Sequence, residues 1–237
     1  MIEYVIHPLI VGANEADQGV MTYLKGYGRR IWIPIYVFYL EGGRERILVD
    51  TGLEQFVVPP HVAEENGVQI LEFEDALATC GLRPEDVDVI IHTHLHNDHC
   101  ENDRKCTNAR VYVQKAELEF FRNPHPIDHR YEPDLLDGVD VVPVEGDSEI
   151  ADGIRVLLTP GHTPGGQSVV VNTRRGRAVI TGFCCNGGNF PPHGQVVALG
   201  VHINAIEAYE SAGRVREIAD ILIPLHDFAV GRSGRIP

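Results

Sequence analysis

The sequence predicts an α/β fold, built as a single domain over residues 1–237. Short runs of β-branched and aromatic residues recur along the chain, and stretches typical of helices stand between them. Hydrophobic residues make up 43% of the chain and charged residues 23%, a mixture that can bury a sizeable core. No break in composition marks a linker, so one large domain is favoured over two small ones.

The first half of the chain is predicted to begin with strands. Strands are expected at residues 5–11, 31–40 and 46–49, and the Glu-Gly-Gly-Arg stretch at 41–44 is typical of a hairpin turn. Residues 14–30 are polar and contain glycine, which indicates a loop. A helix is expected at residues 73–80, because Gly81 stands where helices commonly end.

The second half alternates strands with helices. Residues 87–91 are continuously apolar, which predicts a strand buried on both faces. Residues 122–138 are rich in Pro, His and Asp without periodicity, and predict a long loop. Further strands are expected at 110–113, 141–144, 154–159, 167–171, 178–181 and 221–224, and helices at 115–121 and 205–219. The two loops at 14–30 and 122–138 are expected to shape a substrate pocket.

Charge and composition narrow the classes of partner. The net charge is −14 and no Lys/Arg run is present, which argues against a nucleic acid or an anionic membrane as partner. The longest apolar run is about half of the ~20 residues that a membrane span needs. The N-terminus carries no basic cluster of the kind that opens a signal peptide, so a cytoplasmic location is expected. The five cysteines match no disulfide framework and are expected to stay reduced.

A cluster of histidines follows the apolar strand at 87–91. His94 and His96 are two residues apart, so in an extended segment their side chains point the same way and can hold one metal ion. If the chain then turns into a helix, Asp98 and His99 point elsewhere and can serve a second ion. Imidazole suits zinc, and carboxylate suits zinc or a harder ion. The complete His-x-His-x-Asp-His order is far more specific than a lone His-x-His.

Two further histidines stand just past predicted strands. His162 lies in the rigid Thr-Pro-Gly-His-Thr-Pro-Gly-Gly turn, and His226 lies in Ile-Pro-Leu-His-Asp. In open α/β architectures ligands collect at strand ends, so both are candidates to complete the metal site.

These motifs together resemble the metallo-beta-lactamase superfamily. The resemblance rests on residues 93–99, the turn at His162, the Pro-Leu-His-Asp at His226 and the early Leu-Val-Asp-Thr-Gly at 48–52, which occur in the family's order. It is closest to the branch of the N-acyl homoserine lactonases. The resemblance implies an αββα sandwich, a first ion held by His94, His96 and His162, and a second held by Asp98, His99 and His226. It also implies that Asp50 orients a metal ligand.

The sequence departs from the family pattern after the strand at 178–181. Phe183 stands where the family places an aspartate that bridges both ions, and Asn186 stands where lactonases tend to carry a substrate-binding tyrosine. A shift of one residue would let Cys184 supply a thiolate ligand, with Cys185 as a weaker candidate. Alternatively, both cysteines are buried residues that end a strand. Asn186 and His202 are candidates to contact the substrate.

The resemblance implies a hydrolase that opens a lactone or related ester of a small molecule by attack of a metal-bound hydroxide. One or two Zn²⁺ ions per chain are expected, although another divalent metal is possible, and Asp98 would orient the nucleophile and carry a proton to the leaving group. Alternatives are a thioesterase of the glyoxalase II kind, a beta-lactamase, a phosphodiesterase and a mononuclear iron oxygenase of the same fold. A non-catalytic metal-binding protein is a further alternative, and a homodimer is the default oligomer.

Overall fold

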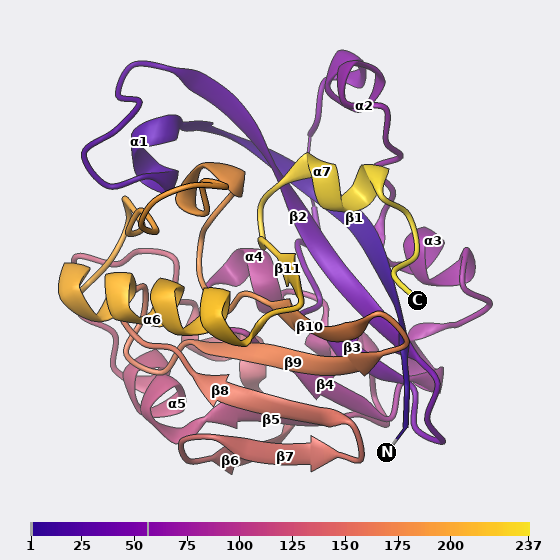
Figure 1. Cartoon of the computed structure of the whole chain (residues 1–237). Coiled ribbons are helices and arrows are strands. Elements are labelled where there is room, and N and C mark those ends of the chain that lie inside the picture. The colour runs from indigo at the N-terminus through magenta and orange to yellow at the C-terminus, as the bar shows by residue number, and fades with distance from the viewer. Residues whose placement is uncertain (1, 56) are drawn as a thin grey trace.

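Two β-sheets form the centre of the computed structural model, which describes residues 2–55 and 57–237 (Figure 1). The first sheet has the order β1-β2-β3-β4-β5-β6, with β1 at Val5–Asp17, β2 at Arg30–Glu41, β3 at Ile47–Val49, β4 at Val89–Ile91, β5 at Arg110–Gln114 and β6 at Asp140–Val144. The second has the order β11-β10-β9-β8-β7, with β7 at Ser148–Ala151, β8 at Ile154–Leu158, β9 at Gln167–Thr173, β10 at Gly176–Ile180 and β11 at Ile221–Ile223.

Seven α-helices accompany the two sheets in the part of the chain that the structure describes. They are α1 at Gln18–Met21, α2 at Pro60–Asn66, α3 at Phe73–Ala78, α4 at Asn97–Cys100, α5 at Lys115–Arg122, α6 at Ala205–Ile218 and α7 at Phe228–Arg232. Short 3-10 turns lie at η1 (Pro84–Asp86), η2 (Asp103–Lys105), η3 (Pro133–Leu136) and η4 (Gly187–Asn189). No helix within residues 2–55 and 57–237 is long and apolar enough to span a membrane.

Three apolar clusters define the layers. The inner faces of the two sheets pack together through residues such as Phe38, Val49 and Ile91 on one side and Val169 and Ile180 on the other. The outer face of the first sheet packs against α3, and the outer face of the second packs against α6. The expected αββα sandwich is therefore confirmed, because each sheet buries one face against its partner and one against helices.

Most of the predicted elements are confirmed within a few residues, but the loop expected at 14–30 is partly wrong. Strand β1 continues to Asp17, which pairs with Arg30 at the start of β2. These two long strands form a ribbon that is held by backbone hydrogen bonds. The polar side chains of residues 14–17 gave no sign of this pairing in the sequence. Elements α2, α7 and β7 were not expected, because their short segments carry little periodicity.

The strand ends bring distant segments to one edge of the sandwich. Strands β3, β4, β5 and β6 run parallel, so their carboxyl ends meet at this edge. The backbone N–H of Gln167, at the start of β9, donates to the carbonyl of Thr93 over 2.8 Å. The N–H of His226, after β11, donates to the carbonyl of Cys185 over 2.9 Å. Both sheets therefore contribute their loops to a single site.

Candidate metal centre

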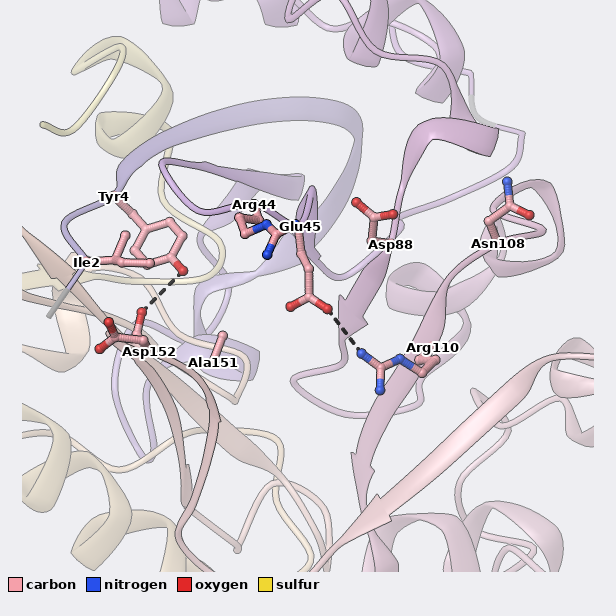
Figure 2. Close-up of a pocket in the computed structure, with 9 residues that line it drawn as sticks. All are labelled: Ile2, Tyr4, Arg44, Glu45, Asp88, Asn108, Arg110, Ala151 and Asp152. Atoms are coloured by element: carbon pink, nitrogen blue, oxygen red, sulfur yellow. Dashed lines mark hydrogen bonds and ion pairs between the residues drawn. The ribbon is translucent and has the colours of Figure 1, made fainter.

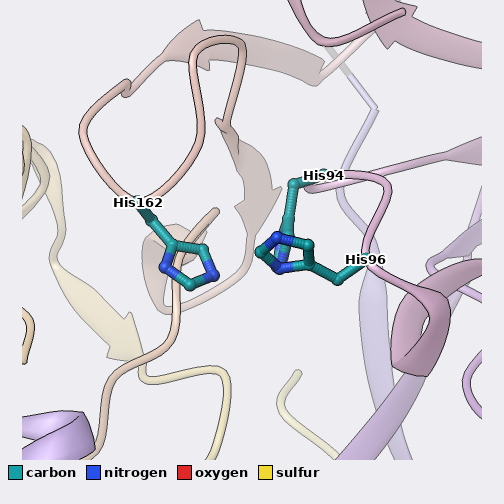
Figure 3. Close-up of side chains that lie close together, drawn as sticks. All are labelled: His94, His96 and His162. Atoms are coloured by element: carbon teal, nitrogen blue, oxygen red, sulfur yellow. The ribbon is translucent and has the colours of Figure 1, made fainter. Parts of the chain in front are cut away.

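Six predicted ligands form two compact groups at this edge. His94, His96 and His162 form one group, and Asp98, His99 and His226 form the other; within each group the potential ligand atoms all lie within 4.8 Å of one another. Figure 3 shows the turn that carries His162 opposite the loop that carries His94 and His96, with the rings directed toward one another. The five histidines are buried and Asp98 is partly buried.

Four of the histidines expose an unpartnered nitrogen to this site. His94 Nε2, His96 Nδ1, His99 Nε2 and His226 Nε2 are buried, and none has a hydrogen-bond partner within the described residues; His99 Nε2 lies 3.5 Å from Asp98 Oδ2, a member of its own group. An unsatisfied polar atom inside a protein costs free energy, so four of them converging on one place need an explanation. A cation that accepts nitrogen lone pairs supplies one, and the set of imidazoles and one carboxylate suits zinc.

The other ring nitrogen of each of these histidines is held by an acceptor. His96 Nε2 lies 3.1 Å from Asp128, His99 Nδ1 2.8 Å from Asp50 and His226 Nδ1 2.9 Å from the carbonyl of Pro34. Carboxylates and carbonyls only accept, so these nitrogens carry a proton, and in a neutral ring the inward nitrogen then carries the lone pair that a metal ion needs. His94 follows the same logic, because Thr93 Oγ1 donates to Asp50 and accepts from His94 Nδ1 over 3.0 Å.

Electrostatics favour the neutral, metal-binding form of several rings. Burial, with added repulsion from neighbouring histidines, lowers the pKa of His94 and of His162 well below 6.5. Burial and the charge of His99 lower the pKa of His226 to about 4. Burial alone would raise the pKa of Asp98, but His99 and His226 outweigh it, so Asp98 is a carboxylate at neutral pH.

Asp50 organises the loop from beneath. Its carboxylate accepts hydrogen bonds from Thr93 N and Thr93 Oγ1, each over 2.7 Å, in addition to the contact with His99. Burial alone would raise its pKa, but the charges and hydrogen bonds of His99 and His92 lower it to about 2. Asp50 also adopts a φ of +59°, a region that non-glycine residues rarely occupy. The expectation that Asp50 orients a ligand agrees with these contacts.

Two buried or nearly buried carboxylates in the site were not expected from the sequence. Asp128 contacts His96 from the loop at 122–138. Glu117, on α5, accepts hydrogen bonds from Leu95 N over 3.0 Å, Tyr131 Oη over 2.7 Å and Gly165 N over 3.0 Å. Glu117 thus ties the loop of His94 and His96 to the turn of His162. An acidic residue within a polar helix gives no local sign of such a role.

The segment at 183–186 places its side chains in different surroundings. Phe183 is buried in the apolar cluster beneath α6, whereas Cys184 Sγ lies 3.2 Å from His162 Nε2. Cys185 Sγ instead lies 3.0 Å from Thr181 Oγ1. Burial raises the pKa of both thiols. Cys184 therefore contacts a member of a ligand group through its thiol, whereas the contact of Cys185 with His226 is made by its backbone carbonyl.

The two residues expected to contact substrate differ in their surroundings. Asn186 caps η4: its Oδ1 accepts from Gly188 N over 2.9 Å, and its amide exchanges long contacts with Gln18. His202 lines a cavity of about 470 Å³ whose wall also contains Asp128 and Arg130. Its Nδ1 lies 2.8 Å from the carbonyl of Leu199. His202 therefore borders open space near the cluster, whereas the Asn186 amide is engaged locally.

Figure 2 shows another cavity, of about 690 Å³, at the opposite end of the same strands. Its wall includes Asp88, which directly precedes β4, and Arg110, which begins β5 and forms an ion pair with Glu45 over 3.1 Å. His94 and His96 follow the other end of β4. The larger cavity therefore lies away from the candidate metal ligands, whereas the wall of the cavity beside His202 includes Asp128, which contacts His96.

Comparison with known proteins agrees with this geometry. The sequence pattern of the metallo-beta-lactamase superfamily matches residues 30–182. An N-acyl homoserine lactonase of a Bacillus species is 32% identical over 169 residues, which is 65% of this chain and 64% of that protein. The chain thus spans a little less than two thirds of the length of this relative.

Solved structures give the same assignment of fold. A crystal structure of a Bacillus thuringiensis AiiA mutant with N-decanoyl-L-homoserine bound is 23% identical, with a TM-score of 0.79, and the match covers 100% of this chain and 98% of that one. A quorum-quenching N-acyl homoserine lactone lactonase is 26% identical, with a TM-score of 0.78 and coverage of 100% and 97%. The expected superfamily is confirmed: the chain belongs to the metallo-beta-lactamase superfamily, and the relatives that it matches include N-acyl homoserine lactonases.

Proposed function

We propose that this chain is a metal-dependent hydrolase that opens a lactone ring or a related ester. The observation that carries the proposal is the set of four buried, unpartnered ring nitrogens directed at one place. Similarity to a lactonase makes a lactone the preferred choice of substrate among carbonyl compounds. The match covers 64% of the length of that relative, so the choice is a proposal. The substrate is a small molecule, since the chain has a net charge of −14 and no basic run for a nucleic acid.

Two zinc ions are the proposed cofactors. His94, His96 and His162 would hold one ion, and Asp98, His99 and His226 the other, because each group gathers three ligand atoms within 4.8 Å. Bound ions of this kind supply a coordinated water of lowered pKa and an electrophile for the carbonyl oxygen. Asp98 would accept a hydrogen bond from the attacking water, take up its proton and pass it to the leaving alkoxide.

We further propose that the Cys184 thiolate completes the metal site in place of the family's bridging aspartate. Two observations support this choice among neighbouring residues. Cys184 Sγ is 3.2 Å from His162 Nε2, and the unpartnered nitrogens of His94 and His96 belong to the same group as His162. Phe183 is committed to the core and Cys185 to Thr181, so neither offers an equivalent ligand.

Metal content and a cobalt spectrum test both proposals about the centre. Protein purified without added metal is expected to contain about two zinc ions per chain, and fewer in Cys184→Ala. The cobalt-substituted protein is expected to show a thiolate-to-cobalt charge-transfer band, which disappears in Cys184→Ser and persists in the matched control Cys185→Ser. A wild-type cobalt protein without that band would contradict the thiolate ligand, whatever its catalytic activity.

A panel of substrates tests the reaction. The wild type is expected to open lactones with a rate that falls on chelation and returns with zinc, followed by proton release in weakly buffered solution. Faster cleavage of thioesters than of lactones would instead support a thioesterase of the glyoxalase II kind. The group of His94, His96 and His162 is complete by itself, which keeps the mononuclear iron oxygenase as a second candidate. One iron per chain together with oxygen uptake would favour it.

The remaining proposals concern the protein in the cell. We propose a single domain that acts in the cytoplasm as a homodimer, the commonest symmetric assembly of soluble proteins. Light scattering coupled to size-exclusion chromatography tests the dimer, since a monomer of 237 residues has a mass of 26.3 kDa.

A further inference from the structure

The cavity of about 470 Å³ borders the metal centre on two sides. On one side, the carbonyl of Val201 accepts from His162 Nδ1 over 2.9 Å. On the other, Asp128 contacts His96 Nε2 over 3.1 Å. Its rim is largely apolar and exposed, with Val20, Tyr27, Ile127 and Ile203. The cavity thus combines a mostly hydrocarbon rim with two residues, Asp128 and Val201, that hydrogen-bond directly to candidate metal ligands.

Among the described residues that line this cavity, Arg130 is the one side chain with a permanent positive charge. Its Nε donates to Asp128 Oδ1 and its Nη2 to Asp128 Oδ2, each over 2.8 Å. This paired contact fixes the plane of the guanidinium. A guanidinium carries five N–H groups, and within the described residues no acceptor is recorded for the two on Nη1. The side chain is 37% exposed, so these donors are accessible.

The charge of Arg130 also reaches the metal centre. Burial is the main cause of the lowered pKa of His162, and the charges of His96 and Arg130 add to it. Burial likewise leads the raised pKa of Cys184, against which Arg130 acts. The contacts agree with this influence, because Arg130 donates to Asp128, and Asp128 lies 3.1 Å from His96 Nε2.

Asn186 stands where the family resemblance expects a substrate-binding tyrosine, but it does not line this cavity. Its side chain is engaged with Gly188 and Gln18 instead. His202 does line the cavity, but its Nδ1 is bonded to Leu199, which leaves one ring nitrogen for a ligand.

We propose that Arg130 is a substrate-binding residue, whose Nη1 donates to a carbonyl oxygen on a substituent beside the scissile ring. The acceptor oxygen would meet Arg130 while adjoining hydrocarbon of the same substrate lies along the apolar rim. This inference rests on the proposed lactone hydrolysis. It adds a residue from the loop at 122–138 that holds no metal ion.

A purely structural role for Arg130 makes a different prediction. Arg130 holds Asp128, and Asp128 holds His96, so loss of the guanidinium could act only through that metal ligand. In that case every substrate would suffer equally and zinc affinity would fall. A direct contact with substrate instead affects only the substrate that carries the acceptor oxygen.

The experiment compares two lactones of equal chain length: N-hexanoyl homoserine lactone, which has an amide carbonyl, and a γ-alkyl-γ-butyrolactone, which lacks it. In Arg130→Met we expect kcat/KM for the amide-bearing lactone to fall about tenfold to a hundredfold, mainly through KM, the range for a charge-assisted hydrogen bond. The fall for the other lactone should be at least tenfold smaller. Arg130→Lys should recover part of the loss.

The matched control is Arg177→Met, because Arg177 also pairs with one aspartate, Asp220, over 3.1 Å and lies outside this cavity. It should leave both lactones unchanged. Zinc content is measured on every variant. An equal loss for both lactones, or no loss for either, would overturn the assignment of Arg130 while wild-type activity still supports the proposed function. A wild type that opens neither lactone would overturn both proposals.

Discussion

Glu117 is the buried residue whose neutralisation should affect the metal centre most directly without removing a ligand. Its Oε1 accepts from Leu95 N and Tyr131 Oη, and its Oε2 accepts from Gly165 N. In Glu117→Gln the amide oxygen can keep the first two bonds. The amide NH₂ then faces the N–H of Gly165, so one charge-assisted bond is lost and a buried donor is left unsatisfied.

The expected loss follows from these contacts. A hydrogen bond to a charged group contributes about 1.5–3 kcal/mol, and an unsatisfied buried donor costs about 1–3 kcal/mol, so the free energy of unfolding should fall by about 2.5–6 kcal/mol. For a chain of this size the Tm should then fall by about 5–24 °C. Zinc affinity should also weaken, because Leu95 lies between two ligands and Gly165 lies three residues beyond a third.

Calorimetry and urea unfolding measure the loss of stability, and a chelator competition measures zinc affinity. Glu119→Gln is the matched control, since Glu119 is exposed on the same helix and the substitution removes the same charge. It should change the unfolding free energy by less than about 0.5 kcal/mol. If Glu117→Gln were as stable as Glu119→Gln and bound zinc equally well, the account of Glu117 as a tie between the two loops would be refuted.

Three further predictions concern the metal ions and the residues that support them. Free zinc at about a thousand times its Kd stabilises the folded state by about 4 kcal/mol, so removing the metal with a chelator should lower the Tm by about 8–16 °C. An unchanged Tm would contradict a metal site. Asp128→Asn should weaken zinc binding about tenfold to a hundredfold through His96, whereas the exposed Asp134→Asn should not; equal affinities would contradict this role. Gly161→Ala should destabilise the protein by about 1–3 kcal/mol, because Gly161 has a φ of +119° and an added Cβ would overlap the backbone of Ala208. Gly213→Ala has open space on α6 and should be neutral or stabilising in the same melts.

The sequence predicted the features that depend on local order. Residues 94–99 are contiguous, so their alternation and the following turn could be derived from chain geometry alone. His162 and His226 were found because both follow strands, and strand ends meet at one edge of a sheet. The structure groups all six of these residues.

Long-range contacts account for what the sequence left out. Glu117 meets Leu95 and Gly165 from 22 and 48 residues away, and Asp128 meets His96 from 32 residues away. The loop expected at 14–30 was partly wrong because β1 gains its last residues by pairing with β2. The different surroundings of Phe183, Cys184 and Cys185 depend on which way the chain turns after β10, and that direction carries no periodic signal.

The six candidate ligands are shared between the two sheets. His94 and His96 follow β4 in the first sheet, whereas His162 and His226 follow β8 and β11 in the second. Metal ions at this edge would therefore join two sheets whose inner faces otherwise meet through apolar contacts. At the far edge, Tyr4 fastens the layers by ordinary hydrogen bonds to Asn172 and Asp152. Loss of metal should thus open the sandwich from one side, with amide hydrogen exchange accelerating around residues 93–99 and 159–166 well before it does around Tyr4.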